Sequence, residues 1–191
     1  MNESIEGVGE FLRIVGRLKK LPRTGWIEAR IRDPESVADH SFRTTILAMV
    51  LSDLEGLNTE KVIRMALLHD VAEAEIGDFT PEAKAGMGEE YMRREEEAFR
   101  SILGRLPNHL AEGYLSLMEE YRNASTPEAN AVSEADKAEM LIQALEYENE
   151  GGDPSSLRHF WETGMGGPFL KELLGHVKQK KKGWISDLRD G

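Results

Sequence analysis

The sequence contains no cysteine, and this absence limits the available chemistry. Disulfides, thiolate nucleophiles and zinc sites built on cysteine are excluded, so any metal must be held by histidine, carboxylate, carbonyl or water ligands. Long apolar runs are also missing, because no segment approaches the roughly 20 residues that a membrane helix needs. The first fifteen residues lack the basic start and apolar middle of a signal peptide. We therefore expect a cytoplasmic protein without a membrane partner.

Positive charge is scarce, since 24 Lys and Arg residues face 35 Asp and Glu residues, for a net charge of -11. This balance disfavours binding to nucleic-acid polymers, which depends on cations that neutralise phosphates. It leaves room for a small anionic substrate, because a local cluster of arginines can override the global field. The basic run "KQKKK" at 178–182 is interpreted as a solvated helix end.

The length of 191 residues, with 40% hydrophobic residues, indicates one sizeable core and one domain over residues 1–191. Apolar residues recur at spacings of three and four, which predicts helices. These helices carry Ile5, Val8, Phe11, Leu12, Val15 and Leu18, then Ile46, Leu47, Val50, Leu51 and Leu54, then Val62, Ile63, Ala66 and Leu67, with further helices over 88–104, 108–122, 127–149 and 168–180. Thr59 is the predicted N-cap of the third, and Pro127 the first residue of the helix that follows Ser125 and Thr126.

Evidence for strands is thin. Only the segment "WIEARIRD" at 26–33 alternates apolar and polar residues, as a short extended segment would, and one such segment cannot form a sheet. Gly77, the Thr80-Pro81 pair and "GGDPSS" at 151–156 interrupt the helical pattern. The predicted fold class is therefore all-α, a compact multi-helix bundle with long connecting loops.

Acidic residues are concentrated in "ALLHDVAEAEIGD" at 66–78. His69 and Asp70 end a predicted helix, Glu73 follows on their face, and Asp78 comes after a glycine turn. Neighbouring carboxylates repel one another unless a cation or a shared proton relieves them. The segment is either a solvated helix end or half of a metal site, and a divalent cation is the simplest relief.

Two further residues complete a candidate ligand set. His40 lies in "PESVADHSF" at the opening of a predicted helix. Asp136 shares its helix face with Val132, Met140 and Gln143, where a carboxylate is costly without a partner. His40, His69, Asp70 and Asp136 together offer two nitrogen and two oxygen ligands, although each alone is more simply a structural or solvated residue. The same plain interpretation applies to His109, His159 and His176.

The order of these residues and their surroundings resemble a known family. The segments "RTGW", "DPESVADHS", "ALLHDVAEAEIGD", "RREEEA" and "EADKAEMLIQALEYE" are similar to the HD-domain metal-dependent phosphohydrolases, in the 5'-deoxynucleotidase branch of YfbR-like and HD-domain-containing protein 2-like enzymes. The likeness spans roughly residues 8 to 165, and the C-terminal helix and basic tail follow it. It implies an all-α HD domain that hydrolyses deoxyribonucleoside 5'-monophosphates, uses a divalent ion (Co, Mn, Mg, Fe, Ni or Zn) and forms a homodimer.

The resemblance also implies roles for individual residues. Glu73 matches the family's active-site glutamate, a general acid or base, and Asp78 matches a position near the substrate sugar. Both carboxylates could instead help to hold a second ion. With four protein ligands, an octahedral ion keeps about two positions for water or phosphate.

Arg23 and Trp26 are the candidate substrate-binding residues. An arginine can bind phosphate in a bidentate manner, and tryptophan offers a face or an edge to a base or sugar. Trp26 precedes His40 by fourteen residues, as the family's active-site tryptophan precedes its first histidine. YfbR-like sequences have an arginine directly before that tryptophan, whereas this chain has Gly25 there and its arginine at position 23.

Two alternatives remain open at this point. Another HD-family phosphohydrolase, such as a phosphodiesterase or a guanosine-tetraphosphate hydrolase, is the first. Two-metal phosphodiesterases of the family use additional histidines, for which only His109 is near enough in sequence. The second is a non-catalytic protein that binds a metal or a nucleotide, which does not account for Glu73 and Asp78 beside the site.

Overall fold

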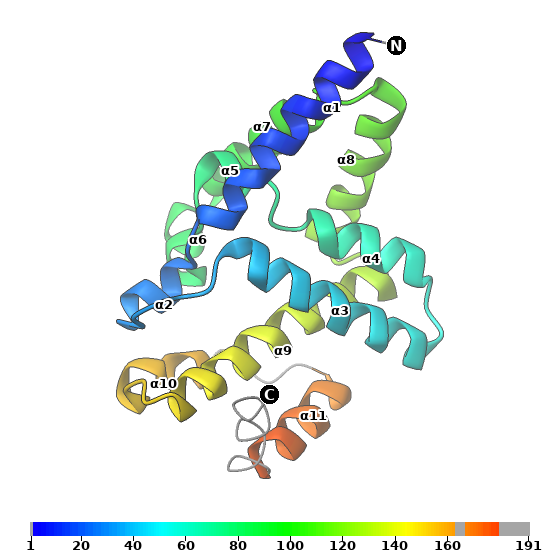
Figure 1. Cartoon of the computed structure of the whole chain (residues 1–191). Helices are drawn as coiled ribbons and strands as arrows, with labels where there is room; N and C mark the ends of the chain where they lie inside the picture. The colour runs from blue at the N-terminus through cyan, green and yellow to red at the C-terminus, as the bar shows by residue number, and fades with distance from the viewer. Residues whose placement is uncertain (1, 163–166, 180–191) are drawn as a thin grey trace, which may run out of the picture.

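The computed structural model describes residues 2–162 and 167–179, and these ranges contain helices and no named strand (Figure 1). The elements are α1 (Asn2–Val15), the 3-10 helix η1 (Gly16–Lys20), α2 (Thr24–Glu28), α3 (Val37–Glu55), α4 (Thr59–Leu68), α5 (Glu73–Ile76), α6 (Pro81–Met87), α7 (Glu89–Leu103), α8 (Asn108–Arg122), α9 (Pro127–Asn149), α10 (Pro154–Glu162) and α11 (Pro168–Gln179). The predicted all-α fold class is confirmed. None of these helices is long and apolar enough to cross a membrane.

The N-termini of α3, α4, α6 and α9 are set by capping side chains that are visible in the sequence. The hydroxyl of Thr126 accepts a hydrogen bond from the backbone of Ala129, and Pro127 opens α9 as predicted. A capping box between Ser36 and Asp39 starts α3 one turn before His40. Because the cap fixes where α3 begins, it also fixes the direction in which the side chain of His40 points from the helix.

Two local predictions were wrong. The N-cap of α4 is Asn58, whose side chain accepts a hydrogen bond from the backbone of Lys61, and Thr59 is instead the first helical residue. The segment at 26–33 is not extended, because α2 covers its first part. Burial of Trp26 decides the conformation there, since this side chain is only 2% exposed and packs on the rings of Tyr147 and Phe160.

The long helix α9 is the centre of the fold. In Figure 1 it runs below α3, with α10 and α11 on its other side. Its buried surface toward α3 and α4 is built largely from small side chains, including Ala129, Ala135 and the neighbouring Val132, which pack with Ala48 and Met65. Small residues let two helices approach closely, so functional side chains on α3 and α9 can meet between them.

A separate core lies under α1, where Phe99, Ile102 and Leu103 of α7 pack against Ile14 and Leu18. The apolar residues of α1 are nevertheless not all buried, because Ile5 and Leu12 are exposed. The spacing of apolar residues predicted the helix correctly but does not by itself tell which of them are buried.

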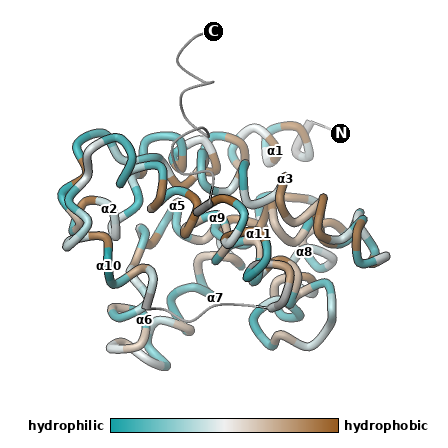
Figure 2. Tube along the Cα trace, turned by 90° about the horizontal axis from the view of Figure 1, so that it is seen from below, coloured by the Kyte–Doolittle hydropathy of each residue, from teal (hydrophilic) through white to brown (hydrophobic). Residues whose placement is uncertain are grey.

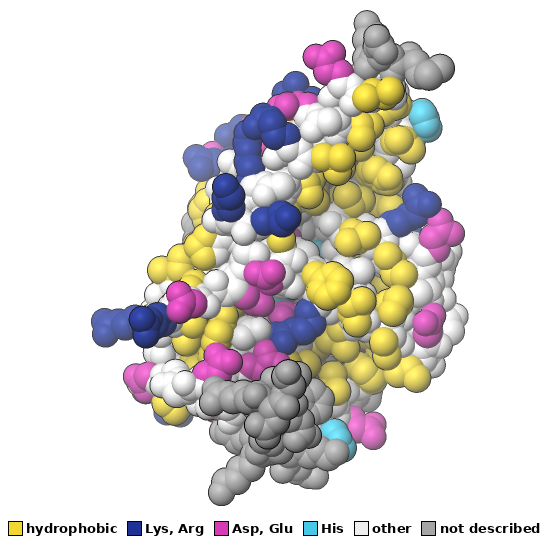
Figure 3. Space-filling view, in the orientation of Figure 1, with side chains coloured by type: hydrophobic (Ala, Val, Ile, Leu, Met, Phe, Trp, Pro, Cys, Tyr) yellow, Lys and Arg dark blue, Asp and Glu magenta, His cyan; other side chains and the backbone are white. Residues whose placement is uncertain are grey.

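One apolar face of α3 is exposed. We call Phe42, Ile46, Val50 and Leu54 the α3 stripe; they recur every four residues along the helix and are 43% to 69% exposed. Figure 2 shows hydrophobic segments along α3, and Figure 3 shows hydrophobic side chains gathered on the molecular face where α3 lies. The side chains of the basic run at 178–182, predicted to be a solvated helix end, lie outside the described residues.

Candidate metal centre and active site

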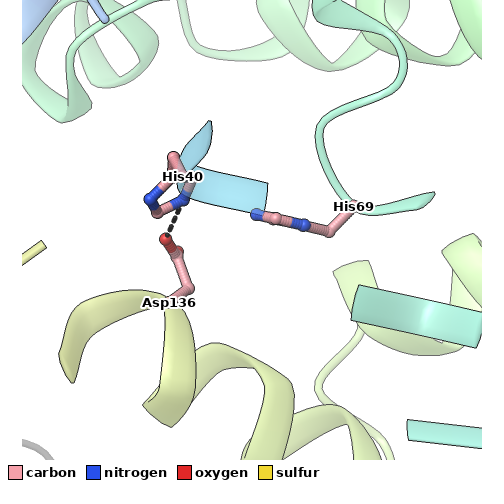
Figure 4. Close-up of side chains that lie close together, drawn as sticks. All are labelled: His40, His69 and Asp136. Atoms are coloured by element: carbon pink, nitrogen blue, oxygen red, sulfur yellow. Dashed lines mark ion pairs between the residues drawn. The ribbon is translucent and has the colours of Figure 1, made fainter. Parts of the chain in front are cut away.

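Three elements bring His40, His69 and Asp136 together (Figure 4). His40 lies in the second turn of α3, His69 caps the C-terminus of α4, and Asp136 lies in the middle of α9. One potential ligand atom from each lies within 4.8 Å of the other two. Oδ1 of Asp136 is 3.0 Å from Nε2 of His40. Residues far apart in the sequence therefore meet where the helices cross.

Asp70 joins this group. Its Oδ2 atom lies 3.1 Å from Nε2 of His69 and 3.7 Å from Nε2 of His40. The structure thus brings all four predicted metal-ligating residues to one point, with two imidazole nitrogens facing two carboxylates. Nitrogen and carboxylate donors of this kind suit several divalent ions.

The donor chemistry of His69 fits a metal ion. Its Nδ1 atom lies 2.7 Å from the carbonyl oxygen of Ala66, an acceptor, so Nδ1 carries the proton of the neutral ring. Nε2 is buried and forms no hydrogen bond, because the Oδ2 atom of Asp70 that faces it at 3.1 Å is itself an acceptor. A buried lone pair without a donor is costly in a protein interior, and a cation bound there would remove the cost.

Carboxylates and imidazoles in the cluster shift one another's pKa. Burial disfavours the charged form of His40, yet its hydrogen bonds with Asp136 and Glu139 outweigh that effect and raise its pKa to about 10. Burial likewise opposes ionisation of Asp136, but the contact with His40 lowers its pKa to about 2. The pKa of Asp70 is also lowered, against the effect of burial, mainly by His69. In the metal-free protein the carboxylates thus stay ionised beside histidines that favour the protonated form, and a bound metal ion would take the place of the imidazole protons.

Glu73 lies beside this cluster on a separate short helix. Turns over 69–72 separate α4, which ends at Leu68, from α5, which begins at Glu73, so Glu73 follows the helix end formed by His69 on a helix of its own. Its Oε1 atom accepts a hydrogen bond from Lys84, at 3.3 Å, whereas Oε2 is buried without a partner. Burial, followed by the charge of Asp70, raises the pKa of Glu73 well above its usual value. Glu73 thus favours the protonated form.

Arg23 reaches the cluster from the loop before α2. Its Nη1 atom lies 3.4 Å from Oδ2 of Asp70, and its Nε atom lies 3.9 Å from Oδ1 of Asp78. Asp78 also accepts a hydrogen bond from the backbone N–H of Thr24, and its own carbonyl accepts one from the Thr24 hydroxyl. Asp78 therefore anchors the segment that carries Arg23, in addition to lying at the site as predicted.

A cavity of about 260 Å³ opens beside the cluster. Its lining includes charged side chains, among them Arg23, Asp70, Asp78, Lys84 and Asp136, and apolar or aromatic ones, among them Trp26, Phe79, Met140, His159 and Phe160. Trp26 contributes to the wall while its indole N–H donates to Glu35, at 2.9 Å. The cavity thus offers both charged and apolar contacts to a ligand. Arg30 and Arg32, which also precede His40, line a different cavity.

Sequence reasoning missed two residues at the site. Lys84 lies on α6 and contacts Glu73, but nothing in its sequence context distinguishes it from an ordinary surface lysine. Glu139 is fully buried against His40, and its spacing of three from Asp136 on the same helix was a signal that could have been used. No metal-capable group among the described residues includes His109.

Comparison with known proteins identifies clear relatives. Residues 15–163 match the model of the HD domain family. The 5'-deoxynucleotidase HDDC2 of Homo sapiens is 42% identical over 175 residues, which cover 90% of this chain and 85% of the human protein. The 5'-deoxynucleotidase hdd1 of Schizosaccharomyces pombe is 39% identical over 185 residues, covering 94% and 92% of the two chains. A solved structure, a conserved hypothetical protein from Pyrococcus furiosus, superposes with a TM-score of 0.73 at 33% identity, covering 88% of this chain and 98% of that one.

The geometry predicts that Asp136→Asn weakens metal binding as well as any activity that needs the metal. Removing one ligating charge should lower the affinity for Mn²⁺ by at least about tenfold. The measurement is metal content after dialysis against Mn²⁺, together with titration calorimetry. Glu82→Gln is the matched control, because Glu82 lines the same cavity outside the cluster. A variant Asp136→Asn with full metal content would contradict its assignment as a ligand.

Proposed function

The chain belongs to the HD-domain family, and from this premise we propose that it is a metal-dependent phosphomonoesterase that hydrolyses deoxyribonucleoside 5'-monophosphates to deoxynucleoside and phosphate. The observation that carries the proposal is the meeting of His40, His69, Asp70 and Asp136 beside a cavity that is lined by both charged and aromatic side chains. The substrate class is supported by relatives about 40% identical over most of their length, which are 5'-deoxynucleotidases by name.

We assign His40, His69, Asp70 and Asp136 as the ligands of one divalent ion. When bound, such an ion polarises a phosphate oxygen and acidifies a water molecule, the two requirements of phosphate-ester hydrolysis. Co, Mn, Fe, Ni and Zn suit the mixed nitrogen and oxygen donors, and Mg suits the carboxylates. The chain's own contribution is to hold these donors in place before the substrate arrives.

Arg23 is the proposed phosphate-binding residue. Its guanidinium lies at the cluster, so a phosphate beside the ligands is within its reach. Contacts with Asp70 and Asp78 hold this side chain in position, which reduces the entropy lost on binding. The nucleoside then extends toward the aromatic wall, where Trp26 and Phe160 pack with a centroid separation of 4.2 Å.

Glu73 is the proposed general acid and base. Its raised pKa favours the protonated carboxyl, and its unpartnered Oε2 atom is free to hold or give a proton. A proton is needed at the 5'-oxygen when the bond to phosphorus breaks, because an alkoxide is a poor leaving group. Lys84 fixes the other oxygen of the carboxyl group.

Replacing Glu73 separates this role from metal binding. Glu73→Gln should retain its metal ion and lose turnover by about 10²- to 10⁴-fold, because it cannot transfer the proton. The measurement pairs metal content with kcat. Loss of metal in parallel with activity would instead favour a second ion held near Glu73 and Asp78.

The reaction is tested by the release of inorganic phosphate. The panel contains 5'-deoxynucleoside, 5'-ribonucleoside and 3'-nucleotide monophosphates, assayed after chelation and after re-addition of Co²⁺, Mn²⁺ or Mg²⁺. We expect metal-dependent release from the 5'-deoxy substrates only. Activity confined to cyclic dinucleotides or guanosine tetraphosphate would point to another HD-family reaction. Inactivity on every substrate, with metal bound, would favour the binding-protein alternative.

We further propose that the protein is a homodimer formed through the α3 stripe. Four large apolar side chains on one helix face favour removal from water, since burial of apolar surface stabilises by about 25 cal/mol per Å². A second copy offers the same face across a two-fold axis.

Ile46→Glu combined with Val50→Glu should yield a monomer by size-exclusion chromatography with light scattering. Met92→Glu on α7, where Met92 is also exposed, should remain dimeric. A monomeric wild-type protein would contradict the proposal.

A further inference from the structure

The two histidines of the candidate metal centre are held by different kinds of acceptor. Nδ1 of His69 faces the backbone carbonyl of Ala66, which every sequence would supply at that position. Nδ1 of His40 faces a side chain, Glu139, whose Oε2 atom lies 2.5 Å away. Glu139 comes from α9 and is completely buried. The orientation of the His40 ring therefore depends on one particular residue.

Glu139 is itself held in place. Its second oxygen, Oε1, accepts a hydrogen bond from Nε of Arg43 at 2.9 Å. Arg43 donates further to Gln143, at 2.6 Å, and to Glu146, at 2.7 Å. All three partners lie on α9, whereas Arg43 lies on α3 one turn after His40. A planar guanidinium with several fixed partners restricts the carboxylate to one position.

Glu139, Glu35 and His40 could also be considered a second metal-capable group, because a ligand atom from each lies within 4.8 Å of the others. The carboxylates of this group already accept hydrogen bonds from other side chains. Arg43 donates to Glu139, and Trp26 donates to Glu35. The group therefore differs from the main cluster, in which Nε2 of His69 forms no hydrogen bond. Glu139 contacts Nδ1 of His40, whereas Asp136 contacts Nε2 on the other edge of the ring.

An acceptor at Nδ1 has a definite effect on a ligating imidazole. It keeps the proton of the neutral ring on Nδ1, so that the lone pair lies on Nε2, and a carboxylate in this place makes Nε2 a stronger donor. In His40, Nε2 is the atom that faces Asp70 and Asp136. We propose that Glu139, restrained by Arg43, is a positioning residue that fixes the tautomer and orientation of His40 and thereby sets the metal affinity of the site. This inference rests on the metal centre of the proposed function and does not depend on the substrate.

The test is metal affinity without substrate. Glu139→Ala should bind Mn²⁺ about 10- to 100-fold more weakly than the wild type by titration calorimetry. Glu139→Gln preserves shape, but one amide group cannot accept from both His40 and Arg43, so its affinity should also fall. Glu146→Gln is the matched control, because Glu146 binds Arg43 from the same helix without contacting His40. The Mn²⁺ affinity of this control should stay within about twofold of the wild-type value, a much smaller change than the one expected for the Glu139 variants.

A spectroscopic measurement separates positioning from general destabilisation. In the Zn²⁺-loaded wild type, ¹⁵N NMR should find a proton on Nδ1 of His40, shifted downfield by the carboxylate, and this shift should be lost in Glu139→Gln. Circular dichroism shows that the variant tested is folded, and Glu139→Gln takes the place of Glu139→Ala where the latter does not fold. Wild-type affinity in the folded Glu139 variants would overturn the inference while leaving the metal centre intact. Absence of metal binding in the wild type would overturn the metal centre and the inference together.

Discussion

The close packing of α3 against α9 is the constraint on which the rest of the site depends. His40 comes from α3, and Asp136 and Glu139 come from α9, so the distance between these helices sets every contact among the three. Small side chains such as Ala135 and Ala48 permit that distance. The contact between α3 and α9 is therefore apolar near α4 and polar around His40. Packing of the apolar part keeps the two helices at the distance that the polar contacts need.

Buried charge is the second organising factor. Ionised carboxylates are costly in a protein interior unless positive groups face them. Behind the cluster, the charge of Glu139 is offset by Arg43, with good geometry. In front of it, Asp70 and Asp136 face two histidines and Arg23. Both oxygens of Glu139 are thus hydrogen-bonded, whereas Nε2 of His69 keeps a lone pair without a hydrogen bond. Only the cluster that contains His69 is therefore suited to bind an ion.

Sequence reasoning succeeded where a local physical rule decides the outcome. The bounds of α8 and α9 follow from periodicity and from Pro127, and the sequence singled out four side chains that the fold brings close together, because each is a carboxylate or histidine at a helix end or on an apolar face. It failed where tertiary contacts decide. Burial of Trp26 makes helical a segment that alternates like a strand, and the hydrogen bond to His40 makes Glu139 part of the site. Local periodicity also could not tell the exposed α3 stripe from a buried face.

The glycine before Trp26 has a wider consequence. A Cβ atom at position 25 would lie 3.2 Å from two ring carbons of Phe160, which is closer than an ordinary van der Waals contact. Phe160 in turn packs on Trp26 and lines the cavity. An arginine directly before the tryptophan would therefore need the Phe160 ring to shift by a few tenths of an ångström, whereas in this chain the guanidinium comes from Arg23. A side chain at position 25 and the ring at position 160 thus compete for the same space beside the cavity, so the size of one limits the size and placement of the other.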